Sequence, residues 1–384
     1  MKTPHIFIAL LVSFGAFFAP PAFAADKTLE MYYLDDVDYE HWAYDELERF
    51  VYADIIDGKV EYRKYSEDEE SDEYIVTDSS DEEAFPWVII NPEGNVTRAQ
   101  FTKMLVNAMN LSAGDMEKSF SDVKSADWYY DYIHIASSQG IVNGKMDGTF
   151  RPNDKITRDQ MAVMIYRAFA PTIDFSAAGK AFQDVEADNF AYEAVVKTAA
   201  KGIIKGHGDV FKPRNWATRA QAVVMIDRAL HQEPGVEEDK PVLTQIVDRN
   251  IKEEMTFTAQ QDVDALKALY HETAMGYQLA YSVADLEMLD GFEEFDGTFT
   301  MEQVGEHSSH VVSMNKRLAE VRVDGLRYKV SMTAPDMSFS MTVDTPGTAY
   351  LKKHEDGKWK IYNFVPDEED VREDWEEKAA AAIN

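Results

Sequence analysis

The segment FSDVKSADWYYDYIHIASSQGIVNGKMDGTFRPNDKITRDQ, residues 120–160, decides the fold because its pattern occurs three times in the chain. Each copy contains an Asp-Val pair, an aromatic residue, a proline step and a Thr-Arg-X-Gln motif. An apolar residue stands two positions before the aspartate of each Asp-Val pair, and the aromatic residue follows it by eight positions in every copy. These positions are 34 and 42, 120 and 128, and 182 and 190. The proline and threonine are five apart, at 92 and 97, 152 and 157, and 213 and 218. This agreement predicts three copies of one structural unit.

Each copy predicts two helices joined by a loop. The first helix follows the aromatic residue and ends at a glycine such as Gly140 or Gly202, which suits a left-handed helix terminus. The second begins at Thr-Arg-X-Gln, where the threonine and the glutamine three residues later form a capping box. Apolar residues then recur at the i, i+3, i+4, i+7 spacing of an amphipathic helix: Phe101, Met104, Leu105 and Ala108; Met161, Met164, Ile165 and Ala168; Ala222, Met225, Ile226 and Ala229. One unit cannot bury both helices, so we expect the three to pack together.

These segments resemble the S-layer homology (SLH) domain in three repeats, at residues 31–111, 115–170 and 178–232. The resemblance implies an all-α, pseudo-threefold helical bundle that holds exported bacterial proteins to the cell wall. It implies binding of a secondary cell-wall polysaccharide that carries pyruvate ketals, in grooves between neighbouring repeats. It also implies that the arginine of each Thr-Arg motif is the key cation: Arg98, Arg158 and Arg219.

The residue types around these arginines favour an acidic sugar independently. An arginine in the first turn of a capped helix lies near free backbone N–H groups, and both attract a carboxylate. Trp42 and Trp128 offer flat faces to sugar rings, with burial in the core as the alternative. Phe190 replaces tryptophan in the third repeat and removes the indole donor. The aspartates of the Asp-Val pairs are either acceptors for sugar hydroxyls or helix caps: Asp36, Asp122 and Asp184.

The first repeat contains an acidic insertion at about residues 59–90, where the other repeats have tight loops. It contains 11 acidic and 3 basic residues, a charge of −8. We predict a solvated loop. The alternative is a divalent-cation site, but the run at 66–73 lacks the Asp-X-Asp-X-Asp-Gly spacing of a calcium loop. An insertion here is expected to affect one groove between repeats.

The first 24 residues have the pattern of a signal peptide, with Lys2 before an apolar run at 6–18 and small residues before a cut after Ala24. An uncleaved anchor is the alternative, but the run is short for a membrane span. We therefore predict an exported protein of 384 − 24 = 360 residues, located outside the cell at the wall or S-layer. No membrane contact is expected after cleavage.

The composition excludes several kinds of partner and site. The 384 residues include 70 Asp and Glu, 38 Lys and Arg, and no cysteine, for a net charge of −32. Such acidity argues against nucleic acid and anionic lipid as partners. Without cysteine there is no disulfide, thiol nucleophile or zinc-thiolate site. The sequence shows no catalytic motif and no metal-ligand spacing, so we expect no cofactor and no metal.

The pattern changes after a predicted linker at residues 233–242. Helices are expected from Leu243 and strands from about Thr298, the order of an α+β domain with an antiparallel sheet. Residues 243–365 resemble the nuclear-transport-factor-two-like superfamily, a cone-like fold, through the segments 261–266 and 356–361 and Tyr270. That superfamily includes enzymes and binding domains, so the resemblance implies no activity. An acidic tail is predicted at 366–384.

The sequence therefore predicts a multidomain protein that is anchored non-covalently to the wall and displays a C-terminal domain. That domain is expected to bind a small ligand or a protein partner, and candidates to line its cone are Tyr277, Tyr281, Asp285 and Asp290. Core packing is the alternative for the two tyrosines. Two other functions stay open: a wall-tethered enzyme with its active site in the cone, and a structural S-layer-associated protein. A cavity in which an aspartate and a tyrosine converge would favour the enzyme.

Overall fold

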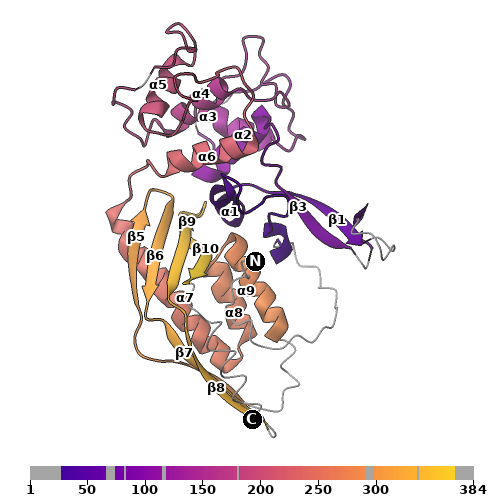
Figure 1. The fold of residues 1–384 in the computed structure, drawn as a ribbon, viewed down its shortest axis with the longest axis vertical. Helices are drawn as coiled ribbons and strands as arrows, with labels where there is room; N and C mark the ends of the chain where they lie inside the picture. Colours follow the sequence, from indigo (N-terminus) through magenta and orange to yellow (C-terminus); the bar gives the residue numbers. More distant parts are fainter. Residues whose placement is uncertain are drawn as a thin grey trace.

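The computed structural model describes residues 27–65, 74–81, 84–114, 118–179, 181–289, 298–334 and 337–367 (Figure 1). The predicted signal peptide, the acidic run at 66–73, Asp290 and most of the predicted acidic tail lie outside these ranges. Figure 1 shows two parts, a helical part formed by the repeats and a second part in which helices pack beside strands.

Within the described ranges, each repeat supplies one outer and one inner helix. The outer helices are α1 (Tyr44–Tyr52), α3 (Tyr130–Ser138) and α5 (Tyr192–Ala200), and the inner helices are α2 (Arg98–Met109), α4 (Arg158–Phe169) and α6 (Arg219–Leu230). A short helix, η1 (Leu29–Tyr32), precedes them. The inner helices contact one another, and each outer helix packs on an inner helix of another repeat: α3 on α2, α5 on α4, and α1 on α6. Because α1 packs on α6, the third repeat closes onto the first.

A ring of three backbone hydrogen bonds joins the repeats just before the inner helices begin. The N–H of Val96 donates to the carbonyl of Ala217 (3.1 Å), that of Ala217 to Ile156 (3.0 Å), and that of Ile156 to Val96 (3.0 Å). All three residues are buried. Buried backbone groups must be paired, so each repeat depends on the other two for its partners.

The ends of the outer helices agree with the predicted left-handed positions. Gly140 and Gly202 have φ of 74° and 69°, and Asp54 takes the equivalent place in the first repeat with a φ of 54°. A glycine has no Cβ to strain at such a φ, whereas aspartate accepts it at some cost. The three repeats thus share this turn despite the different residue.

The insertion in the first repeat contains a small sheet, which corrects the expectation of a solvated loop. Its strands β1 (Lys59–Tyr65), β2 (Tyr74–Thr77) and β3 (Phe85–Ile89) are antiparallel in the order β2-β1-β3. The β3 sequence is rich in aromatic and β-branched residues, which favour strands. The sheet projects sideways from the helical part (Figure 1). The repeats therefore do not form an all-α unit.

The second part is α+β, as predicted. Its helices are α7 (Lys240–Gln260), α8 (Val263–Thr273) and α9 (Gly276–Leu289). Its strands form two antiparallel sheets, β10-β9-β6-β5 and β4-β7-β8: β4 (Thr298–Gln303), β5 (Ser308–Met314), β6 (Leu318–Asp324), β7 (Arg327–Ala334), β8 (Met337–Asp344), β9 (Gly347–Lys353) and β10 (Trp359–Pro366). The long helix α7 lies along the strands (Figure 1).

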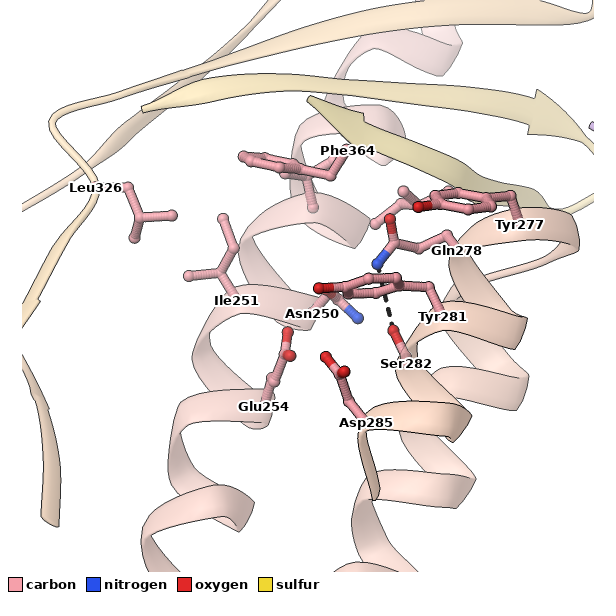
Figure 2. A pocket seen from close by; sticks show the side chains of 12 residues that line it. Asn250, Ile251, Glu254, Tyr277, Gln278, Tyr281, Ser282, Asp285, Leu326 and Phe364 are labelled. Carbon is pink, nitrogen blue, oxygen red and sulfur yellow. Dashed lines mark hydrogen bonds between the residues drawn. The ribbon is translucent and has the colours of Figure 1, made fainter. Parts of the chain in front are cut away.

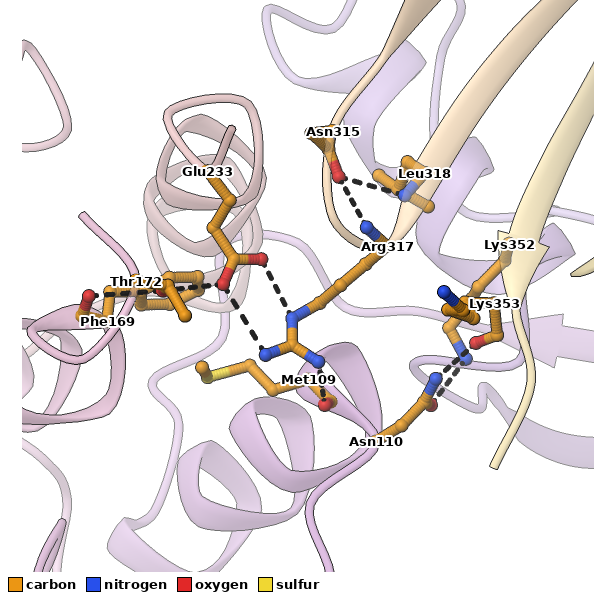
Figure 3. A network of polar contacts seen from close by, with 10 residues as sticks. All are labelled: Met109, Asn110, Phe169, Thr172, Glu233, Asn315, Arg317, Leu318, Lys352 and Lys353. Atoms are coloured by element: carbon orange, nitrogen blue, oxygen red, sulfur yellow. Dashed lines mark hydrogen bonds and ion pairs between the residues drawn. The ribbon is translucent and has the colours of Figure 1, made fainter. Parts of the chain in front are cut away.

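The predicted linker at 233–242 is partly helical and is fixed to both parts. It contains the short helix η2 (Glu237–Asp239) and the start of α7. The Glu233 carboxylate, whose side chain is 0% exposed, accepts hydrogen bonds from Arg317 Nε (2.8 Å) and Thr172 Oγ1 (2.7 Å) (Figure 3). Arg317 also donates to the carbonyl of Met109 on α2. The core of the repeats continues into the second part through Met275, Ala280, Leu318 and Tyr362, so the two parts are packed together.

Candidate functional site

Two of the predicted arginines are buried between neighbouring repeats. Arg98 and Arg158 are 6% and 4% exposed. Nε of Arg98 donates to the carbonyl of Phe150, and Nε of Arg158 to that of Phe211, both at 2.9 Å. Each guanidinium also lies over the ring of the same phenylalanine, at 4.6 and 4.7 Å from the centroid, a favourable cation–π geometry. These two arginines therefore join each repeat to the next.

Arg219 occupies the equivalent position between the third and first repeats but is bonded differently. The first repeat has Ile90 where the others have a phenylalanine. The Arg219 Nη2 donates to the carbonyl of Asp57 at 2.6 Å, while its buried Nε has no partner. Burial lowers the pKa of this guanidinium because it removes water from the charge. Arg98 and Arg158 each use Nε in a hydrogen bond, whereas the Nε of Arg219 is left unpaired. An unpaired buried donor is costly.

The backbone at the starts of the inner helices is not free, which corrects the expectation that its N–H groups attract an anion. Those of Arg98 and Ala99 donate to the carbonyls of Asp154 (2.9 Å) and Pro152 (3.0 Å), and the other two repeats repeat both contacts. Any attraction for an anion here therefore depends on the guanidinium groups.

The three threonines also cap these helices unequally. Thr97 forms the full capping box, and Thr218 accepts from the N–H of Gln221. Thr157 instead donates its hydroxyl to Asp159 and accepts no capping hydrogen bond. The predicted box is thus complete in only one repeat.

The aspartates of the Asp-Val pairs fix the proline step rather than cap helices. Both carboxylate oxygens of each accept backbone N–H groups at 2.7 Å: Asp36 from Ile90 and Asn91, Asp122 from Phe150 and Arg151, and Asp184 from Phe211 and Lys212. The second of the two donors to each aspartate (Asn91, Arg151 or Lys212) has a φ between 54° and 59°. Non-glycine residues rarely adopt this conformation. The helix-cap interpretation is therefore wrong, and each clamp holds a strained turn.

The predicted aromatic positions lie at the surface. Trp42, Trp128 and Phe190 are 57%, 55% and 69% exposed, so the core alternative is wrong for both tryptophans. A fourth exposed aromatic residue, Trp216, has Lys155 Nζ 4.4 Å from its ring centroid. Sequence analysis missed Trp216 because the other repeats have no aromatic residue at that position.

A pocket in the second part lies between α7, α9 and β10 (Figure 2). It is lined by Val247, Asn250, Ile251, Glu254, Tyr277, Gln278, Tyr281, Ser282, Asp285, Leu326, Ile361 and Phe364. Three of the four predicted lining residues are present, and the fourth, Asp290, lies outside the described residues. Sequence analysis missed Glu254. Val247, Asn250, Ile251 and Glu254 stand at positions i, i+3, i+4 and i+7, so they share one face of α7.

Two carboxyl groups converge in this pocket. Glu254 and Asp285 point toward one another from α7 and α9 (Figure 2). Burial raises the pKa of each to about 7, and the nearby Glu254 charge adds to the rise at Asp285. The Tyr270 hydroxyl donates to Glu254 Oε1 at 2.9 Å, which opposes part of the effect. Paired carboxyl groups with raised pKa values are typical of functional sites.

Comparison with known proteins identifies the repeats in part. The S-layer homology domain family matches residues 119–162 and 181–223, which lie in the second and third repeats. An amylopullulanase of Thermoanaerobacterium thermosulfurigenes is 37% identical over 35% of this chain and 8% of its own length. A cellulosome-anchoring protein of Acetivibrio thermocellus is 31% identical over 39% of this chain and 35% of its own. The S-layer protein sap of Bacillus anthracis is 29% identical over 46% and 22%.

The chain thus spans about a third or less of the length of these relatives. The similarities confirm the prediction of S-layer homology segments in the second and third repeats, and the first predicted repeat lies outside the residues that the family matches. Among solved structures, the intermembrane space region of chloroplast protein ARC6 matches 34% of this chain and 98% of its own at 14% identity, with a TM-score of 0.26, too low to establish a shared fold. The cone-like interpretation of the second part stays a prediction.

Two kinds of feature are absent from the residues that the structure describes. No helix there has the length and apolarity needed to cross a membrane. In the same ranges, no group of three or more His, Asp or Glu side chains is placed to hold a metal ion.

Proposed function

We propose that the three repeats anchor this exported protein non-covalently to the bacterial cell wall by binding an acidic secondary cell-wall polysaccharide, and that the second part is displayed on the wall. The similarity to a cellulosome-anchoring protein and to an S-layer protein supports the anchoring role. The pyruvate ketals that the resemblance implies carry carboxylates, and guanidinium groups bind carboxylates well.

The observation that carries the proposal is the guanidinium of Arg219, which is partly exposed and whose Nη2 donates to the carbonyl of Asp57. Arg98 and Arg158 are buried, and their Nε atoms donate to the neighbouring repeat. We therefore assign the groove between the third and first repeats as the main site for the polymer. Trp42 and Trp128 are exposed enough to stack on sugar rings in neighbouring grooves. The aspartates at 36, 122 and 184 contribute by holding the groove walls.

The test is co-sedimentation of the protein with purified cell-wall sacculi, before and after the wall polysaccharide is removed. We expect Arg219→Ala to reduce pelleting at least tenfold, and the matched control, Arg214→Ala at an exposed position five residues earlier, to leave it unchanged. Equal pelleting with stripped walls would overturn the anchoring role. Equal effects of the two substitutions would overturn the assignment of the groove.

A second candidate function is a wall-tethered enzyme with its active site in the pocket of the second part. The converging Glu254 and Asp285 favour it, because carboxyl groups whose pKa is about 7 suit general acid–base chemistry. This function would be identified by an enzymatic activity that either Glu254→Gln or Asp285→Asn abolishes, while each variant still pellets with sacculi.

A further inference from the structure

The lining of the pocket in the second part is strongly asymmetric in charge. Its twelve residues include two carboxyl groups and the side-chain amides of Asn250 and Gln278, but no Lys, Arg or His. The titratable groups around Glu254 are Asp285, Tyr277 and Tyr281 on α9, Tyr270 on α8 and Tyr328 on β7. All of these groups are neutral or negatively charged near neutral pH, so none supplies a positive charge. The pocket therefore has a deficit of positive charge.

Burying two facing carboxyl groups without a counter-charge is unfavourable, because desolvation and mutual repulsion both oppose ionisation. The Tyr270 hydroxyl donates a hydrogen bond to Glu254 Oε1, but it brings no positive charge to the pair. A positively charged group between Glu254 and Asp285 would relieve both costs.

The walls of the pocket add an aromatic surface to this acidic end. Tyr277, Tyr281 and Phe364 line it from α9 and β10 (Figure 2). Tyr277 is held in place from the repeats, since it stacks on Tyr52 of α1 at a centroid distance of 4.1 Å and an interplanar angle of 9°. Aromatic faces attract cations and pack against flat apolar groups. A ligand with a charged head and a flat body matches both features.

We propose that this pocket binds a small organic cation, with an ammonium head between Glu254 and Asp285 and an apolar or aromatic body against Tyr277, Tyr281 and Phe364. The inference deepens the display role proposed above and is independent of wall anchoring, because every lining residue lies in the second part. Failure of anchoring is measured by pelleting and failure of this inference by ligand titration, so the two are distinguishable.

The experiment is isothermal titration of the full chain with 2-phenylethylammonium and with 2-phenylethanol, a neutral molecule of the same shape. At pH 8 we expect the cation to bind at least tenfold more tightly than the alcohol. Carboxyl groups of pKa about 7 are about 90% ionised at pH 8 and about 10% at pH 6. Binding of the cation should therefore weaken about tenfold at pH 6, while binding of the alcohol should not change.

Isosteric variants then assign the effect to residues. Glu254→Gln and Asp285→Asn should each remove the preference for the cation and its pH dependence, while the exposed control Asp264→Asn on α8 should keep both. Circular dichroism shows whether each variant is folded. Equal binding of the two probes, no binding at about 10 mM probe, or a preference that survives in both pocket variants would overturn the proposal.

Discussion

The buried pair Glu233–Arg317 should be a main determinant of how the second part is held on the repeats. Glu233 lies just after the last repeat and Arg317 just before β6. Their side chains are 0% and 12% exposed, and Nε and Oε2 are 2.8 Å apart. Glu233→Gln keeps the shape and one acceptor but removes the negative charge that faces the guanidinium. Breaking a buried ion pair from one side costs about 3–5 kcal/mol.

We expect the lower end, about 3 kcal/mol, because glutamine retains one acceptor and Arg317 keeps the carbonyl of Met109 as a partner. The assay is equilibrium unfolding in urea at pH 7, followed by tryptophan fluorescence. A matched control is Asp344→Asn, which breaks the exposed Arg327–Asp344 pair within the second part. Exposed pairs contribute about 0–1 kcal/mol. Similar losses in the two variants would refute the argument that this interface is stabilised by a desolvated charge pair.

Three further substitutions and one pair of surface changes test other parts of the structure. Asp122→Asn should lower the unfolding free energy by about 1–3 kcal/mol, because an amide presents one acceptor to two N–H donors; a loss below about 0.5 kcal/mol in urea would contradict the clamp. Glu254→Gln should raise it by about 3 kcal/mol at pH 8 and leave it unchanged at pH 4: a carboxyl whose pKa rises from 4.5 to about 7 on folding destabilises the protein increasingly over that window. An equal effect at both pH values would contradict the assigned cause. Gly276→Ala should lower the melting temperature sharply, since a Cβ would lie 1.9 Å from the Tyr52 carbonyl oxygen at a φ of +56°; an unchanged value would show that α1 and α9 move apart freely. Trp42→Ala and Trp128→Ala should weaken pelleting with sacculi and leave the melting temperature within about 2 °C, because both side chains are exposed; a large thermal shift would assign them to packing.

The sequence was sufficient for features that depend on local pattern. Periodicity located the inner helices, and glycine spacing located the left-handed turns at 140 and 202, both of which the structure contains. The change from helical to alternating pattern located the α+β part. These features depend on short-range backbone preferences and amphipathic spacing, which one repeat shows as well as three.

Features that depend on contacts between repeats were not accessible in this way. The bonding of Arg219 depends on how the third repeat meets the first, where its partner Asp57 lies 162 positions earlier in the chain. The role of Asp122 required knowledge that the chain returns to it 28 residues later. The strands β1 to β3 were not predicted because the segment was judged by its total charge. That total does not show that β-branched and aromatic residues cluster at the two ends of the segment.

Net acidity and the buried arginines are compatible for a physical reason. A chain of charge −32 repels an anionic polymer at long range, but screening limits that repulsion to about 10 Å at ordinary salt. Arg219, the contact we propose for the polymer, acts inside that distance, at a position where burial removes competing water. The same field concentrates cations near the surface, which favours the ligand class assigned to the pocket of Glu254 and Asp285. The proposed preference of the repeats for an anion and of the second part for a cation thus follows from the local placement of a few residues. The long-range potential changes the rate at which ligands approach, and the buried groups determine which ligand binds.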